Sequence, residues 1–345
     1  MRLPVLDTFS AICLFLVVCV HTNPQIGGDW QIMGAPGATF LLSQGCRFVL
    51  PFFFITAGYY YGKALQMGVE PFAFLVLFGR KLLYIFFSWS VIYAIIPPFF
   101  IHEWEQFGLV DTVYYSLSDT YDWLISNRWK ALIYGTKPHL WFITSSLIGI
   151  TVASVFCRRH LKRYLIPFGI VLYVVGLLGG SYAITPIGLP QYQYFDLQAP
   201  FVSTLFIAIG RMLSVHHKRN MKLALTLFFG GALVHFAEVY CLYKAYGMDV
   251  LNHHFLLGTT VWGAGAFLLC LEFPNAGRDS FLESIGKLTM GIYVSHVAII
   301  YIVTYLDRIV PGLPWEIAKP FAVLVLSYCL SLGLSRVRIL AKFLT

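Results

Sequence analysis

The chain has 345 residues, of which 58% are hydrophobic and 12% are charged, and its formal net charge is +8. A soluble domain carries about a quarter charged residues, so this composition argues against a soluble globule and excludes a disordered chain. The apolar runs reach the roughly 20 residues that a helix needs to cross a bilayer, and they do not alternate as barrel strands do. Length and composition therefore predict an all-α, polytopic membrane helix bundle.

A window of about 19 residues predicts ten spans. They cover 5–22, 39–62, 76–101, 139–157, 164–184, 197–216, 221–244, 251–273, 283–307 and 316–341. The longest stretch between spans, 102–138, is rich in Tyr, Trp and Asp, and we expect an extracytoplasmic loop or cap there. The first run has no small-residue cleavage site, so we expect it to stay as a span. Without an internal repeat or a soluble segment, 1–345 is predicted to be a single transmembrane domain.

Lysine and arginine placement predicts the orientation. With a cytoplasmic N-terminus, 17 of the 24 Lys and Arg residues fall in cytoplasmic segments and 6 fall outside, while Arg47 lies within a span. This asymmetry follows the positive-inside rule and predicts that both termini are cytoplasmic. The excess of positive charge is explained by cations that face anionic lipids at the cytoplasmic surface of the membrane. No nucleic-acid partner is therefore expected.

The seven cysteines do not indicate a disulfide framework or a metal site. Their number is odd, all lie in or beside apolar runs, and no CxxC pair occurs. We therefore expect no metal in this chain.

Two ionisable side chains are expected in the outer half of the membrane. His21 lies near the outer end of the first span, and Arg47 lies roughly 12 Å below the outer end of the second. Charged or titratable groups inside a membrane are costly, so each is a functional candidate. A neutral imidazole beside a fixed cation suits a general base, and the guanidinium suits an oxyanion. Both could instead form only structural hydrogen bonds with neighbouring helices.

Two further pairs have competing structural explanations. Arg80 and Lys81 open the third span, and alone they indicate a positive-inside anchor whose side chains snorkel. His235 and Glu238 are three residues apart, so they share a helix face. This second pair could orient a hydroxyl or hold a proton, and a structural hydrogen bond is equally compatible with the spacing.

The remaining histidines lie in or beside spans. His296 lies about halfway along the ninth span, where an interhelical hydrogen bond competes with a functional role. His139 opens the fourth span, and Trp141 fits an aromatic belt at the outer interface. His253 and His254 are expected at the membrane interface.

Five short motifs follow one another between positions 6 and 296. They are Leu6-Asp7 with an apolar helix ending in His21-Thr22; Arg47-Phe-Val-Leu-Pro51-Phe-Phe-Phe-Ile-Thr-Ala-Gly58; Arg80-Lys81-Leu-Leu; His139-Leu-Trp-Phe142; and Gly291-Ile-Tyr-Val-Ser-His296. Together they resemble the membrane-bound acyltransferase-3 family, which acylates bacterial cell-surface sugars. The length is most similar to that of short members, without an attached soluble domain, that O-acetylate glycans.

Two positions depart from the family pattern. Ser10 stands where the family has Arg, and Thr56-Ala57 replaces the usual Ser. An Arg in the first helix could contact a phosphate-bearing acyl donor. Arg80, Lys81 or Arg2 could supply that charge instead.

The resemblance implies transfer of an acyl group, usually acetyl, from cytoplasmic acyl-coenzyme A to a hydroxyl of a cell-surface polysaccharide or lipid-linked glycan. It implies an integral protein of the bacterial cytoplasmic (inner) membrane, with acetyl-CoA as the acyl donor. In this interpretation His21 is the base or acyl carrier, Arg47 stabilises the oxyanion, and Arg80 and Lys81 bind the acyl donor. The further candidates for binding a substrate are His139, Trp141, His235, Glu238 and His296.

Two other functions remain open. A transporter or flippase of a glycolipid or small molecule also suits ten helices with intramembrane His, Glu and Arg, although no inverted repeat is found. Ser10 in place of the family Arg would also suit a catalytically inactive family member that binds a biosynthetic complex.

Overall fold

The computed structural model describes residues 2–24, 26, 30–189, 200–337 and 341, and in this part of the chain the regular structure is almost entirely helical. In these residues, eight helical segments are long and apolar enough to cross a membrane, and two shorter apolar helices accompany them. Each of these segments coincides with one predicted span, which confirms the all-α membrane bundle. Two of the cations counted as cytoplasmic, Arg338 and Lys342, lie outside the described residues. Residues 197–199 of the sixth predicted span and 338–340 of the tenth also lie outside them.

The spanning elements are α1 (Pro4–Thr22), α2 (Gly37–Gly45) with α3 (Val49–Gln66), α4 (Pro71–Ile95), α8 (Trp141–Arg158), α9 (Leu165–Gly179), α10 (Ser203–His216), α11 (Met221–Tyr246), α12 (Leu257–Glu272), α14 (Thr289–Val303) and α15 (Leu313–Arg336). Between them lie β1 (Gln31–Ile32), β2 (Ala35–Pro36), α5 (Phe100–Phe107), α6 (Leu109–Ser126), α7 (Arg128–Tyr134) and α13 (Phe281–Lys287). Short 3-10 turns are η1 (Pro138–Leu140), η2 (Lys162–Tyr164), η3 (Val250–Asn252) and η4 (Thr304–Arg308). The two short strands pair antiparallel.

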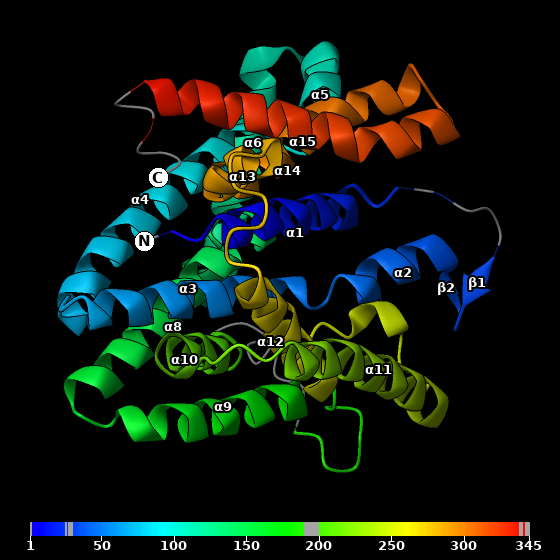
Figure 1. The fold of residues 1–345 in the computed structure, drawn as a ribbon. Helices are drawn as coiled ribbons and strands as arrows, with labels where there is room; N and C mark the ends of the chain where they lie inside the picture. Colours follow the sequence, from blue (N-terminus) through cyan, green and yellow to red (C-terminus); the bar gives the residue numbers. More distant parts are fainter. Residues whose placement is uncertain (1, 25, 27–29, 190–199, 338–340, 342–345) are drawn as a thin grey trace.

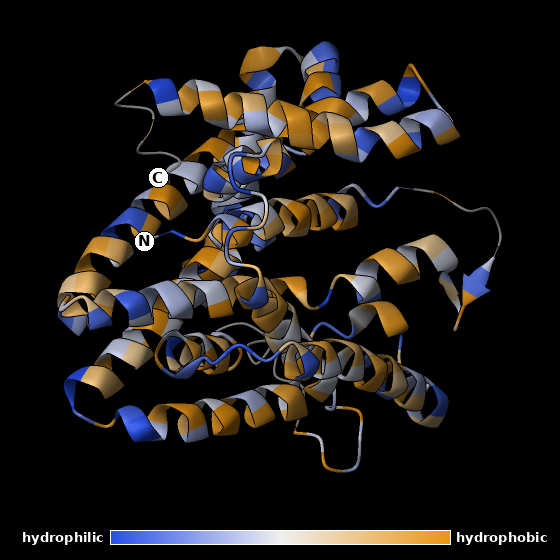
Figure 2. Ribbon diagram, viewed as in Figure 1, coloured by the Kyte–Doolittle hydropathy of each residue, from blue (hydrophilic) through white to orange (hydrophobic). Residues whose placement is uncertain are grey.

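Helices α1, α3, α9 and α15 run roughly along one common axis, whereas α4, α8 and α12 cross it obliquely (Figure 1). Helix α1 begins and α15 ends at one end of the bundle, and the β1–β2 hairpin lies at the opposite end. Hydrophobic residues run along the helices, whereas hydrophilic residues gather at the turn between α8 and α9 and at the hairpin (Figure 2). The end with the α8–α9 turn is the predicted cytoplasmic end, called inner below, and the hairpin end is called outer.

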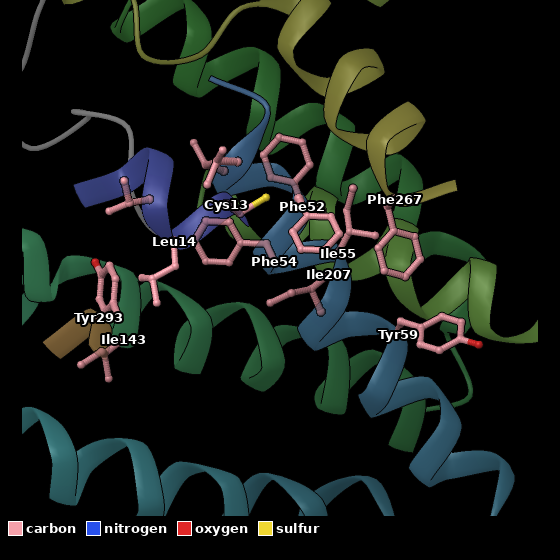
Figure 3. Packing of buried hydrophobic residues seen from close by; sticks show 14 of the residues in the cluster. Cys13, Leu14, Phe52, Phe54, Ile55, Tyr59, Ile143, Ile207, Phe267 and Tyr293 are labelled. Atoms are coloured by element: carbon pink, nitrogen blue, oxygen red, sulfur yellow. The ribbon is translucent and has the colours of Figure 1, made fainter. Parts of the chain in front are cut away.

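The centre of the bundle is packed around α3. Phe52, Phe54 and Ile55 of this helix lie among side chains of α1, α10 and α12 (Figure 3). Glycines let α3 and α10 approach closely: a Cβ on Gly58 would lie 2.1 Å from the Ile207 carbonyl oxygen. Small residues are the usual means of close helix packing in membranes, because lipid supplies no hydrophobic drive between helices.

The second predicted span is not one continuous helix, and this corrects the sequence interpretation. Helix α2 ends at Gly45 and α3 begins at Val49, so Arg47 lies in a turn between them. The physical reason is Pro51, whose ring would clash with the carbonyl of the residue four positions earlier, which is Arg47. The break takes Arg47 out of a regular helix surface and lets its side chain reach other elements.

The stretch 102–138, expected to be a loop or cap, consists largely of helices α5, α6 and α7. Helix α6 is tied to α4, because Ser116 Oγ donates a 2.8 Å hydrogen bond to the Ala94 carbonyl oxygen. The ninth predicted span is also divided, because Leu288 separates the end of α13 from the start of α14.

Candidate active site

His21 lies in the last turn of α1. The helix ends directly after it, with Asn23 in the left-handed conformation (φ 41°). The ring Nδ1 lies 3.0 Å from the Val17 carbonyl oxygen one turn earlier. The side chain lines a cavity of about 220 Å³, which we call the outer cavity.

Arg47 lines the same cavity from the turn between α2 and α3. Its guanidinium donates hydrogen bonds to His254 Nδ1 (2.6 Å), Ser43 Oγ (2.9 Å) and the Leu251 carbonyl oxygen (2.8 Å). All three partners are neutral acceptors, because a guanidinium has only donors and an imidazole nitrogen that accepts carries no hydrogen. Arg47 Nε is buried and has no hydrogen-bond partner. The cation is therefore held firmly while part of its donor capacity remains unused.

The structure brings several other candidates to this cavity. His139 lines it from η1, Trp141 from the start of α8, and Tyr293 from α14. His139 is buried, and its Nε2 has no hydrogen-bond partner. His296 is not among the residues that line the cavity, but it contacts one of them: its Nε2 lies 3.1 Å from His21 Nδ1.

His254 also lines the outer cavity, and the sequence interpretation missed it. The sequence analysis expected it at the membrane interface. The contact with Arg47 joins residues 207 positions apart, so no local pattern could have indicated it.

His235 and Glu238 are not among the residues that line this cavity. Both ring nitrogens of His235 are hydrogen-bonded, Nδ1 to Thr259 Oγ1 (2.9 Å) and Nε2 to Gln44 Oε1 (3.1 Å). The Glu238 carboxylate accepts hydrogen bonds from the backbone N–H groups of Leu257 and Gly258, and from the Tyr182 hydroxyl. Glu238 thus satisfies the free N–H groups at the start of α12.

A second, larger cavity of about 510 Å³, the inner cavity, lies toward the inner ends of α1, α3 and α4. Lys81 and Arg2 bring positive charge to its lining. Asp7 lines it too and accepts a 2.9 Å hydrogen bond from Arg2 Nε. Arg80 is exposed and is not among the lining residues.

Both departures from the acyltransferase motifs face this inner cavity. Ser10 lines it from α1, and Thr56 and Ala57 line it from α3. The substitutions are therefore concentrated in one place, and none of them lines the outer cavity.

A small cavity of about 30 Å³ lies between the two larger ones. It shares Val17, Leu50 and Tyr293 with the outer cavity. It shares Phe53, Phe142, Thr289 and Met290 with the inner cavity. The three cavities thus follow one another through the bundle, with aromatic and aliphatic side chains at the narrow point.

A family model described as an acyltransferase domain matches residues 4–336. The chain belongs to the membrane-bound acyltransferase-3 family. This family membership agrees with the membrane-spanning helices of the fold. A curated relative from Enterococcus faecalis, named as an amino-acid racemase, is 25% identical over 178 residues. That match covers 51% of this chain and 22% of the relative, so the chain spans only about a fifth of that protein. No solved structure matches the chain.

Proposed function

We propose that this acyltransferase moves an acyl group, usually acetyl, from acyl-coenzyme A on the cytoplasmic side of the bacterial inner membrane to a glycan on the other side. The acceptor is a hydroxyl of a cell-surface polysaccharide or a lipid-linked sugar. One observation carries the proposal. His21 and Arg47 line one cavity, and a small cavity that shares lining residues with both lies between it and a cation-lined cavity toward the inner end.

The inner cavity suits the acyl donor. Coenzyme A carries phosphates, and Lys81 and Arg2 supply cations in the lining. The pantetheine arm is long and thin, so it suits the narrow region between the two cavities, where Phe53 and Phe142 line the small cavity. A donor held in this way would present its thioester carbonyl beside His21, while its charged end stays at the inner face.

In the direct route, the acceptor hydroxyl loses its proton to His21 Nε2 as its oxygen attacks the thioester carbonyl carbon. The tetrahedral oxyanion then accepts hydrogen bonds from the Arg47 guanidinium, which lines the outer cavity. When the C–S bond breaks, the thiolate of coenzyme A takes the proton back from the His21 imidazolium. The products are the O-acyl glycan and free coenzyme A.

A second route has the same balance. His21 Nε2 attacks the thioester carbonyl carbon and the coenzyme A thiolate leaves, which gives an acyl-imidazolium. The acceptor oxygen then attacks the acyl carbon, its proton passes to the thiolate, and neutral His21 is released. Both routes need a bare nitrogen on His21 and a cation near the carbonyl oxygen.

The outer cavity also suits a sugar. Trp141 and Tyr293 bring aromatic rings to its lining, and His139 lines it too. His139 and Trp141 are therefore retained as candidates for binding the acceptor. His235 and Glu238 would have to act indirectly, because their polar atoms are already bonded within the protein.

The test is sided acyl transfer. Acetyl-CoA labelled in the acetyl group is added to inverted membrane vesicles from cells that make the surface glycan, and label in the glycan is measured. We expect labelling in inverted vesicles and none in sealed right-side-out vesicles, and His21→Gln should abolish it. Movement of a glycolipid without acylation would instead support a transporter, and neither activity would support a catalytically inactive member.

A further inference from the structure

A buried histidine of α14 contacts the histidine at the end of α1. His296 is fully buried, and its Nε2 lies 3.1 Å from His21 Nδ1. The two ring centroids are 4.9 Å apart. The other ring nitrogen of His296, Nδ1, lies 2.5 Å from the backbone carbonyl oxygen of Tyr293. Since a carbonyl oxygen only accepts hydrogen bonds, His296 Nδ1 carries a hydrogen.

His21 Nδ1 has two close neighbours, and together they determine where its hydrogen is. One is the Val17 carbonyl oxygen at 3.0 Å, and the other is His296 Nε2. A doubly protonated His296 would donate to His21 Nδ1, which would then face the Val17 carbonyl without a hydrogen. A neutral His296 offers a lone pair instead, and the hydrogen on His21 Nδ1 is shared between two acceptors. In the neutral arrangement the Val17 carbonyl oxygen, the Tyr293 carbonyl oxygen and His296 Nε2 all accept a hydrogen bond.

We infer that His296 is a positioning residue that holds His21 in the tautomer with hydrogen on Nδ1, leaving Nε2 bare for the reaction. This tautomer is the minor one of free histidine in water, so acceptors on Nδ1 are needed to maintain it. The tautomer itself follows from the hydrogen bonds alone. Only its consequence for catalysis rests on the proposed acyl transfer.

The backbone around His296 is fixed from two other elements. The Tyr93 hydroxyl of α4 donates to the Val294 carbonyl oxygen (2.7 Å) and accepts from the Ala298 N–H (3.1 Å). The Tyr293 hydroxyl donates to the His139 carbonyl oxygen. The titratable rings that face His296, besides His21, are Tyr293 and His139, with ring centroids 5.7 Å and 5.5 Å away. His296 therefore has little freedom to turn away from His21.

The contact favours the transition state over the ground state. Once His21 Nε2 has taken the proton of the acceptor hydroxyl, the imidazole is positively charged. The hydrogen bond from His21 Nδ1 to His296 Nε2 is then charge-assisted, and such bonds are roughly twice as strong as neutral ones. An interaction that strengthens as charge develops raises kcat rather than binding of the substrates.

Three variants of His296 separate its two hydrogen bonds. His296→Gln keeps an amide oxygen at about the reach of Nε2, so it can still accept from His21. His296→Asn keeps an N–H for the Tyr293 carbonyl but is too short to reach His21. His296→Leu keeps neither. We expect the Gln variant to retain kcat within a few-fold, and the Asn and Leu variants to lose about 10- to 100-fold in kcat with little change in KM.

The tautomer is measured directly by ¹⁵N NMR of histidine-labelled protein in lipid, with His21→Gln used to assign the His21 signals. We expect hydrogen on Nδ1 in the wild type and in His296→Gln, and a mixture of tautomers in His296→Asn. Hydrogen on Nε2 of His21 in the wild type would overturn the inference, as would an unchanged kcat in a folded Asn variant. If the wild type transfers no acyl group, the proposed function fails, but the NMR result still decides the tautomer.

Discussion

The α1–α14 region and the α11–α12 region both hold titratable side chains inside the bundle. They differ in how many polar atoms of those side chains are already hydrogen-bonded to the protein. In the α11–α12 region, both nitrogens of His235 are bonded to protein atoms, and Glu238 caps a helix. In the α1–α14 region, only one nitrogen of His21 is bonded, and the ring borders a cavity. A titratable group inside a membrane therefore indicates chemistry only when part of its bonding capacity faces a cavity.

The largest expected effect tests this difference directly. His21→Gln keeps a polar side chain of similar reach but cannot take the proton, so acyl transfer per folded molecule should fall by about 10²- to 10⁴-fold. His235→Gln is the matched control. It should lower the amount of folded protein, while transfer per folded molecule stays within a few-fold. The measurements are the transfer rate and the folded fraction of each variant in detergent or vesicles. An equal loss of transfer per folded molecule in the two variants would contradict the difference between His21 and His235.

The same comparison extends to buried cations. Arg47 has three neutral hydrogen-bond partners, whereas Lys319 of α15 is paired with Asp307 at 3.0 Å and Glu316 at 3.2 Å. Arg47→Gln should lower acyl transfer by about 10²- to 10³-fold, the usual loss for an oxyanion donor.

Lys319→Gln is the control for Arg47. Removing the Lys319 ammonium leaves the Asp307 and Glu316 carboxylates without their shared partner, so this variant should lose folded protein rather than specific activity. Specific activity is measured on the folded fraction isolated by size-exclusion chromatography. A larger loss of specific activity in Lys319→Gln than in Arg47→Gln would contradict the assignment of Arg47 to the site.

The inner cavity offers a second contrast, between two adjacent cations. Lys81 lines the cavity and Arg80 does not. If Lys81 binds a phosphate of coenzyme A, Lys81→Gln should weaken binding of acetyl-CoA by about 1.5–3 kcal/mol, while Arg80→Gln should leave it nearly unchanged. Binding of acetyl-CoA to purified protein is the measurement. If neither variant binds more weakly, Lys81 is only an anchor at the membrane surface.

The smallest effect is expected at Ser10, because this change adds a contact to a site that already has cations. Ser10 lines the inner cavity one turn from Asp7, so the cavity offers space and a carboxylate to an arginine there. Ser10→Arg should tighten binding of acetyl-CoA by a few-fold, with Ser10→Ala as an unchanged control. A folded Ser10→Arg protein with unaltered affinity would show that the position does not face the acyl donor.

Local sequence rules explain part of the candidate site and miss the rest. Pro51 lies four residues after Arg47 and breaks the second span at the turn that holds Arg47. The rule for proline could have predicted that turn from the sequence. His254 could not be found in this way, because its partner Arg47 is 207 residues away. The contact between His296 and His21 spans 275 residues and also depends entirely on how α1 and α14 pack.

The sequence by itself determined that this is a helical membrane protein, where its spans lie and which short motifs relate it to an acyltransferase family. Those properties are local, since hydropathy over about 20 residues decides whether a segment enters the membrane. The tertiary structure decided which of the buried polar groups remain chemically available. That depends on partners from other helices: Thr259 and Gln44 complete the hydrogen bonds of His235, whereas His21 meets a cavity on its remaining side.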